Sequence, residues 1–181
     1  MIATFTGDGL TVAEVAWQEP GIWGSSRPRT MACRFATVAR WAYDNVHSSA
    51  GVFVAQGTSG GASQVAFALT YYGLGDILDL ANIGSGPPLC PLCPFNSTNL
   101  EPLLPRGGAA TVQPQLGYRS TVRIFLGANE ESPDIVADAN AYFSAITSAK
   151  SMTRIPGTGH HIEETQNGIN AYIQSVRSAL R

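Results

Sequence analysis

The sequence is poor in charge, in cysteine and in long apolar runs, and each shortage excludes a class of protein. Only 13% of its 181 residues are charged, against about a quarter in typical proteins, and the net charge is −2. Nucleic-acid binders need clustered Lys and Arg, whereas the only neighbouring basic residues are Arg27 and Arg29, so no nucleic-acid partner is expected. Three cysteines are too few for a disulfide scaffold. No apolar run reaches about 18 residues, so no membrane span is expected.

Apolar residues make up 44% of the chain, which is enough for a sizeable core. At roughly 150 residues per domain, the length predicts that residues 1–181 form one domain. The chain opens without a basic region followed by a long apolar run, so no signal peptide is visible. The compartment stays open at this stage, secretion included if the native N-terminus lies upstream of Met1.

Short apolar runs alternate with helical patterns along the chain. The expected strands are Val12–Trp17, Val52–Ala55, Ile77–Ile83, Thr121–Leu126 and Ser151–Ile155. The expected helices are Met31–Val46 with Thr30 as its N-cap, Ala62–Tyr72, Asp134–Ala149 and Glu163–Leu180. Prolines concentrated between Pro87 and Pro114 make residues 87–119 an irregular excursion. The alternation predicts an α/β fold, with a mostly parallel sheet of about five strands and helices on both faces.

Residues capable of chemistry follow three of these strands. Gly57–Gly61 reads Gly-Thr-Ser-Gly-Gly, which fits G-x-S-x-G at a junction of strand and helix. Glu130 follows the fourth expected strand and His160 follows the fifth. Each signal alone has a simpler explanation: an N-capping serine, acids that favour a helix N-terminus, or a loop histidine without a role. Together they occur in the order Ser, acid, His, each at the end of its own strand, which is the chain order of α/β-hydrolases.

From Leu10 to the C-terminus the sequence resembles the C-terminal portion of the α/β-hydrolase superfamily, in its serine esterase and lipase branch. The resemblance implies that Ser59, the centre of G-x-S-x-G, is the nucleophile. It implies that His160, which follows glycine, is the general base rather than His161. It also implies that Glu130 orients the histidine, although the family more often has Asp at that place.

Further site residues follow from the same resemblance. Asp134 and Glu131 are the fallback choices for the acid. The backbone N–H of Gly60 is the expected oxyanion donor. Trp23, in a loop expected on the rim of the site, is a weaker candidate for contact with an acyl or aryl group.

The implied function is hydrolysis of a small carboxylic ester through an acyl-enzyme, without metal or cofactor. One alternative is a proline-type peptidase or amidase on the same scaffold. Another is an inactive α/β-hydrolase-like remnant. Epoxide and haloalkane hydrolases carry Asp where this chain has Ser59, which argues against those two reactions.

The resemblance also implies a missing part. No first three strands and no loop with a second oxyanion donor precede Val12. Either the chain is a fragment, which we favour, or another segment such as Gly21–Thr30 supplies that donor. Loss of one donor typically lowers the rate by about 10²–10³, so low activity is expected. The uncovered sheet edge beside Val12–Trp17 also predicts self-association.

The remaining motifs favour no metal site. Cys90 and Cys93 have C-x-x-C spacing but lack two further ligands for zinc. A disulfide within this pair, or between one of them and Cys33, is the better explanation in an oxidising compartment. Asn96 begins a glycosylation sequon, which matters only in a secreted eukaryotic protein.

Overall fold

The structure, a computed structural model, describes residues 1–16, 28–86 and 115–181, without the side chains of residues 28–30. Its strands are β1 (Val54–Thr58), β2 (Leu80–Gly84), β3 (Thr121–Gly127) and β4 (Lys150–Ile155). Its helices are α1 (Ile2–Gly7), α2 (Pro28–Asn45), α3 (Gly60–Tyr71), α4 (Pro133–Ala145) and α5 (Gln166–Ala179), with short 3₁₀ turns η1 (Leu74–Asp76) and η2 (Ile162–Glu164). No helix among these residues is long and apolar enough to cross a membrane.

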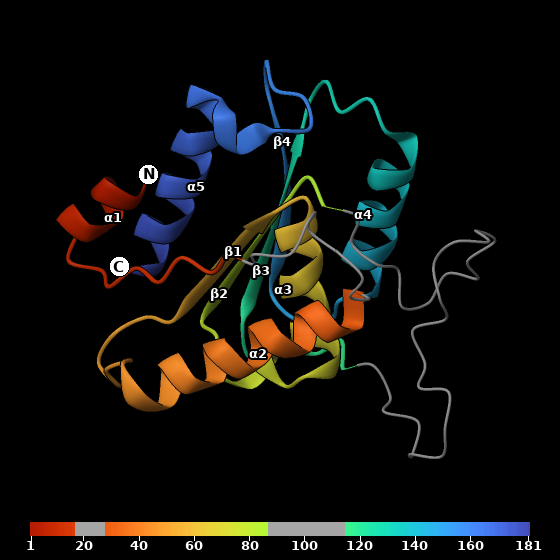
Figure 1. The fold of residues 1–181 in the computed structure, drawn as a ribbon. Helices are drawn as coiled ribbons and strands as arrows, with labels where there is room; N and C mark the ends of the chain where they lie inside the picture. The colour runs from red at the N-terminus through yellow and green to blue at the C-terminus, as the bar shows by residue number, and fades with distance from the viewer. Residues whose placement is uncertain (17–27, 87–114) are drawn as a thin grey trace, which may run out of the picture.

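The four strands form one parallel sheet in the order β1-β2-β3-β4 (Figure 1). Because successive side chains of a strand point to opposite faces of the sheet, β3 contributes side chains to two hydrophobic clusters. Val122, Ile124 and Leu126 belong to a large cluster with residues of α2, α3 and α4. Phe125 points to the other face and packs edge-on against Tyr172 of α5, with ring centroids 5.2 Å apart. The α/β fold with helices on both faces is therefore confirmed.

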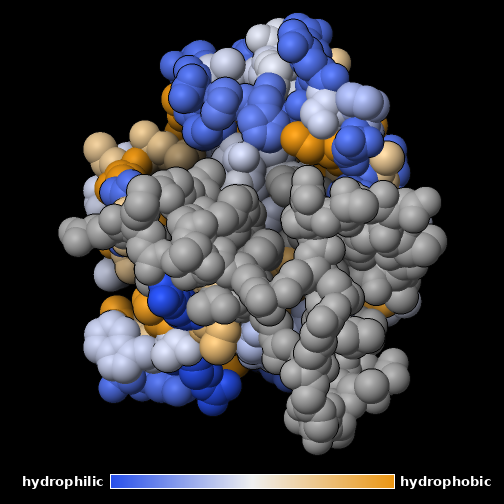
Figure 2. Space-filling view, turned by 45° about the vertical axis from the view of Figure 1, so that its right-hand side comes forward, coloured by the Kyte–Doolittle hydropathy of each residue, from blue (hydrophilic) through white to orange (hydrophobic). Residues whose placement is uncertain are grey.

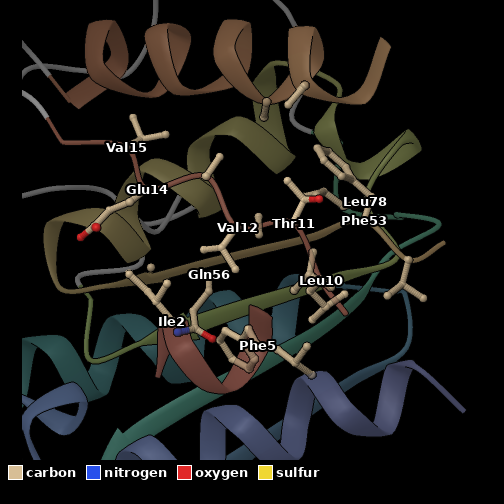
Figure 3. Close-up of a pocket in the computed structure, with 18 of the residues that line it drawn as sticks. Ile2, Phe5, Leu10, Thr11, Val12, Glu14, Val15, Phe53, Gln56 and Leu78 are labelled. Carbon is tan, nitrogen blue, oxygen red and sulfur yellow. The ribbon is translucent and has the colours of Figure 1, made fainter. Parts of the chain in front are cut away.

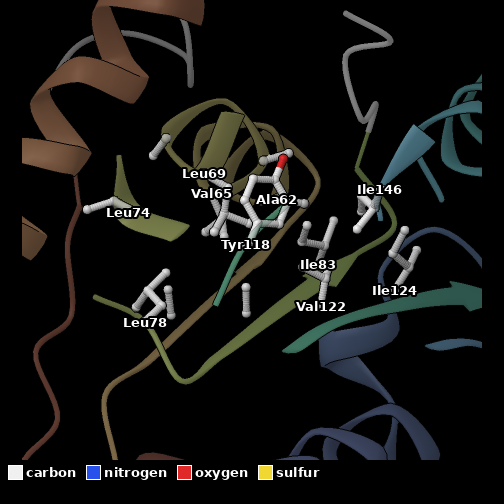
Figure 4. Close-up of a cluster of buried hydrophobic side chains, with 14 of the residues drawn as sticks. Ala62, Val65, Leu69, Leu74, Leu78, Ile83, Tyr118, Val122, Ile124 and Ile146 are labelled. Atoms are coloured by element: carbon white, nitrogen blue, oxygen red, sulfur yellow. The ribbon is translucent and has the colours of Figure 1, made fainter. Parts of the chain in front are cut away.

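The larger core lies between the sheet and α3 (Figure 4). α3 is apolar almost all round because it is covered by α2 on one side and by the sheet on the other. Tyr118 closes the cluster, and its hydroxyl takes part in buried hydrogen bonds with those of Thr70 (3.0 Å) and Tyr142 (3.2 Å). The segment 115–118, at the end of the predicted excursion, contains neither helix nor strand. Residues 87–114 lie outside the described part.

The prediction of a strand at Val12–Trp17 is wrong for residues 12–16, and Trp17 lies outside the described residues. This segment and β1 line a common hollow of about 1170 Å³ (Figure 3). A strand exists only through hydrogen bonds to a neighbour, and no backbone bond joins residues 12–16 to β1 in the described structure. The described sheet consequently has four strands rather than about five, and β1 and β4 are its edge strands.

Several element boundaries also differ from the predicted ones. α2 begins at Pro28, so Thr30 lies inside the helix and is not its N-cap; proline is favoured in a first helical turn. The expected helix Glu163–Leu180 is divided into η2 and α5. Thr165 caps α5 by accepting a hydrogen bond from the Gly168 N–H at 3.1 Å.

Asp79 joins the starts of three strands. Its carboxylate accepts hydrogen bonds from the Phe53 N–H (2.8 Å) and from Arg119 (2.7 Å). Its own N–H donates to the Phe53 carbonyl, and its carbonyl accepts from the Thr121 N–H. Burial alone would raise the pKa of Asp79, but the bonds from Phe53 and Arg119 outweigh burial and lower it below 3.8.

We predict that Asp79→Asn lowers the free energy of unfolding by about 1–2 kcal/mol at pH 7, because two charge-assisted bonds are lost. A carboxyl whose folded pKa is lowered stabilises the protein above its unfolded pKa, and this stabilisation disappears as the pH falls through the folded value. The difference between wild type and variant should therefore shrink below about pH 4. Urea unfolding from pH 7 to pH 2.5 measures it.

Asp44→Asn is the matched control, since Asp44 pairs with Arg40 on the exposed face of α2. This substitution should lower the free energy of unfolding by about 0.5 kcal/mol or less. Equal effects of the two substitutions would contradict the structural role of Asp79.

Candidate active site

The three residue positions singled out at strand ends meet at the carboxyl end of the sheet, because the carboxyl ends of parallel strands lie together. The loops after β3 and β4 occupy the upper end of Figure 1, and hydrophilic side chains gather at the same end of Figure 2. The residues concerned are Ser59 after β1, Glu130 after β3 and His160 after β4.

Ser59 occupies a sharp turn between β1 and α3. Its backbone has φ 55° and ψ −119°, a conformation that a residue with a side chain rarely adopts. The Ser59 N–H donates to the Gly84 carbonyl at 2.8 Å, which fixes the turn against β2. A Cβ at Gly57 would lie 2.4 Å from the Gly61 backbone, so only glycine allows strand and helix to close around the serine.

Two hydrogen bonds connect the three side chains. The Ser59 Oγ lies 2.9 Å from Nε2 of His160, and Nδ1 of the same ring lies 2.9 Å from Glu130 Oε2. The Glu130 side chain is 2% exposed and that of His160 is 27% exposed. The acid is therefore shielded from water, while the imidazole stays within reach of a substrate.

Close backbone contacts hold the two loops that carry Glu130 and His160. A Cβ at Gly127 would lie 2.1 Å from the Gly159 carbonyl oxygen, so the loops touch at a pair of glycines. The Asn129 N–H donates to the Thr158 carbonyl at 2.9 Å. The second carboxylate oxygen of Glu130, Oε1, accepts from the Ser132 N–H at 3.3 Å. These bonds fix the acid and the histidine relative to each other.

The other predicted residues lie elsewhere or in different roles. Glu131 and Asp134, the fallback acids, are exposed, and the described contacts of His160 Nδ1 go to Glu130 instead. His161 is exposed and faces Glu163, with its Nδ1 3.4 Å from Oε1. Gly60 is the buried first residue of α3, where an N–H has no acceptor within the helix. Trp23 lies outside the described residues.

A few polar residues around the site were not predicted from the sequence. The Tyr172 hydroxyl forms a 2.8 Å hydrogen bond with Thr58 Oγ1, directly before Ser59. Burial raises the pKa of Tyr172, so it stays a neutral phenol. Ser85, after β2, has φ 35° and a buried hydroxyl without a partner among the described residues. Tyr172 resembled an ordinary core position of an amphipathic helix, and only the glycines around Ser85 signalled an unusual backbone.

Potential metal ligands gather beside the site. His161, Glu163 and Glu164 offer ligand atoms within 4.8 Å of one another. All three side chains are exposed or half-exposed, and such groups are common without an ion. Cys33 is exposed and forms no disulfide within the described residues. Cys90, Cys93 and Asn96 lie outside the described residues.

We predict that Gly57→Ala lowers the free energy of unfolding by about 1–3 kcal/mol, because the new methyl group meets backbone atoms that cannot move aside. Gly61→Ala is the matched control. A Cβ there meets nothing within 4 Å, and alanine is the better helix former, so stability should be unchanged or rise by up to about 1 kcal/mol. Urea denaturation measures the free energy of unfolding of both variants. An unchanged free energy for Gly57→Ala would contradict the tight turn.

Comparison with known proteins rests on structure. No protein-family model and no curated protein matches the sequence. The chain is similar to Est1E from Butyrivibrio proteoclasticus, with TM-score 0.59 and 15% identity over 87% of this chain and 73% of that one. It is similar to a Bacillus cereus carboxylesterase, with TM-score 0.52 and 18% identity over 82% of this chain and 59% of that one.

It is also similar to a protein of unknown function, Atu2452 from Agrobacterium tumefaciens, with TM-score 0.56 and 16% identity over 84% of this chain. The chain spans 63% of the length of that protein. Proteins named hydrolase or esterase recur among such structural neighbours. Together with the parallel sheet and the turn at its first strand, these similarities show that the chain has an α/β-hydrolase-like fold.

Proposed function

We propose that this chain is a serine hydrolase that cleaves carboxylic esters through an acyl-enzyme at Ser59. The observation that carries the proposal is the continuous chain of hydrogen bonds from Ser59 Oγ through the His160 ring to the shielded carboxylate of Glu130. A serine hydroxyl is a weak nucleophile at neutral pH and needs an adjacent base, which this arrangement supplies.

In the first half of the reaction, Ser59 Oγ attacks the carbonyl carbon of the ester and its proton passes to His160 Nε2. Glu130 accepts the hydrogen bond from Nδ1–H, which holds the neutral ring in the reactive tautomer and then stabilises the imidazolium. The carbonyl oxygen becomes an oxyanion next to the Gly60 N–H. His160 returns the proton to the departing alcohol, and the acyl group stays on Ser59.

In the second half, a water molecule takes the place of the alcohol. His160 removes its proton, the hydroxide oxygen attacks the acyl carbon, and the carboxylic acid leaves as Ser59 recovers its proton. The burial of Glu130 matters in both halves, since a charge shielded from water interacts more strongly with the imidazolium.

The choice of ester over amide is supported by the structural neighbours named esterase or carboxylesterase. A proline-type peptidase would use the same three side chains. Turnover of p-nitrophenyl acetate measured beside that of an aminoacyl-proline anilide separates the two substrate classes. Faster cleavage of the anilide would overturn the ester proposal.

We predict that a fluorophosphonate probe labels Ser59 and that Ser59→Ala abolishes the label. His160→Ala should slow labelling by at least about 10³-fold, because the base is lost. Intact-mass and peptide-mapping spectrometry measure both.

His161→Ala is the control for the adjacent histidine, which faces Glu163 and should label at the wild-type rate. Absence of labelling in a folded wild-type chain would instead favour the inactive remnant.

We predict that Glu130→Gln lowers kcat for p-nitrophenyl acetate by about 10⁴-fold, because an amide can hold the histidine in the wrong tautomer. The neighbouring Glu131→Gln changes an exposed side chain in the same loop and should leave kcat unchanged. Equal rates for the two variants would show that Glu130 is not the orienting acid.

A further inference from the structure

The smaller of the two cores described above lies between the sheet and α5 (Figure 1). Its buried members are Phe125, Ile155, Ile162 and Tyr172. Tyr172 is fully buried and is the one member of this set with a hydroxyl group. A buried tyrosine hydroxyl needs a hydrogen-bond partner, so the place of that partner decides which part of the protein the tyrosine holds.

The Tyr172 hydroxyl contacts both strand ends that hold the nucleophile turn. It forms the 2.8 Å hydrogen bond with Oγ1 of Thr58, the residue directly before Ser59. It also lies against Gly84, where a Cβ would overlap it. The Gly84 carbonyl in turn accepts the hydrogen bond from the Ser59 N–H. The hydroxyl therefore fills the space between the ends of β1 and β2 that fix the backbone of Ser59.

The same tyrosine packs against the segment that carries His160. Ile162 belongs to the same cluster, and its Cδ1 and the Tyr172 hydroxyl both crowd the position that a Cβ of Gly84 would take. The Ile162 N–H donates to the His160 carbonyl at 3.0 Å. A displacement of Ile162 is therefore passed on to the backbone of the histidine.

The first turn of α5 joins Ile162 to the helix that carries Tyr172. Thr165 Oγ1 donates to the Ile162 carbonyl at 3.0 Å and accepts from the Gly168 N–H at 3.1 Å. A Cβ at Gly168 would overlap the Ile162 carbonyl, so helix and loop touch backbone to backbone. Tyr172 follows Gly168 by four residues and so lies on the same face of the helix. The tyrosine and the histidine segment are thus held as one unit against the serine turn.

We propose that Tyr172 is a positioning residue of the active site, which sets the distance between Ser59 Oγ and His160 Nε2. This assignment rests on the proposed function, because it concerns the same site. Tyr172 acts through its neighbours: Thr58 transmits its position to the serine, and Ile162 transmits it to the histidine. Reacting groups misplaced by about 1 Å can lose about 10²-fold in rate, so a small shift at this hydroxyl is measurable.

A purely structural role of the hydroxyl would have a different consequence. Its loss would then reduce the fraction of folded chains and leave each folded site as fast as before. Exhaustive labelling with a fluorophosphonate counts the competent sites, so kcat divided by the number of labelled sites separates the two roles.

The experiment compares Tyr172→Phe with Tyr142→Phe in turnover of p-nitrophenyl acetate. Both substitutions remove the hydroxyl of a fully buried tyrosine, but that of Tyr142 bonds Tyr118 in the larger core. The kcat per labelled site should fall at least about tenfold in Tyr172→Phe, with KM little changed. Tyr142→Phe should stay within about twofold of the wild type, because its hydroxyl holds neither the serine turn nor the histidine segment.

Thr58→Val and Thr58→Ser test the hydrogen bond from its other end. Valine removes the hydroxyl at nearly the same volume and should lower kcat per labelled site about as much as Tyr172→Phe. Serine keeps the hydroxyl and should restore most of that rate. Valine and phenylalanine together should be no more than about twofold slower than either alone, because both remove the same bond. The Thr58 pair decides the question if Tyr172→Phe does not fold by circular dichroism.

A labelled and active wild type, with Tyr172→Phe and Tyr142→Phe equally fast per labelled site, overturns the role of Tyr172 and leaves the proposed function standing. Equal rates for Thr58→Val and Thr58→Ser, or a change in KM alone, do the same. A folded wild type that is not labelled overturns the proposed function, and the role of Tyr172 with it.

Discussion

The approach of β1 to the first turn of α3 constrains the rest of the site. Gly57 and Gly61 touch backbone to backbone, and this contact forces Ser59 into a positive φ. In that conformation the hydroxyl stands at the carboxyl edge of the sheet instead of turning into the core. The Ser59 N–H bond to Gly84 and the Thr58 bond to Tyr172 hold the turn from two further sides. A strained residue persists only where its surroundings determine it so completely.

The second requirement is that groups 101 and 30 residues apart meet within hydrogen-bond distance. Parallel pairing supplies the coarse alignment, since it brings the carboxyl ends of β1, β3 and β4 to the same end of the sheet. The contact of Gly127 with Gly159 and the bond from Asn129 to Thr158 supply the fine alignment. The acid and the histidine thus approach the serine as one preformed unit, which avoids ordering them anew when a substrate binds.

Local patterns in the sequence were enough to predict the α/β class, the turn at Ser59 and the three strand ends, because apolar runs and glycine spacing act locally. The strand expected at Val12–Trp17 is absent from residues 12–16 because pairing is not local: suitable residues form a strand only where a neighbouring backbone bonds to them. The choice between His160 and His161 depended on the resemblance, since adjacent residues differ only in where the loop points them. The hydrogen bond between Tyr172 and Thr58 joins residues 114 positions apart, and no sequence pattern in either segment predicts it.

β1 leads directly into the candidate site, because Ser59 follows its last residue, Thr58. The central claim, however, concerns Ser59 alone: that His160 makes its hydroxyl a nucleophile. Rapid acid quenching during turnover of p-nitrophenyl acetate, followed by peptide mapping, tests it most directly. The account predicts a mass increase of a single acetyl group per chain, located on Ser59. An active chain that carries no acetyl group, or carries it on another residue, would contradict it.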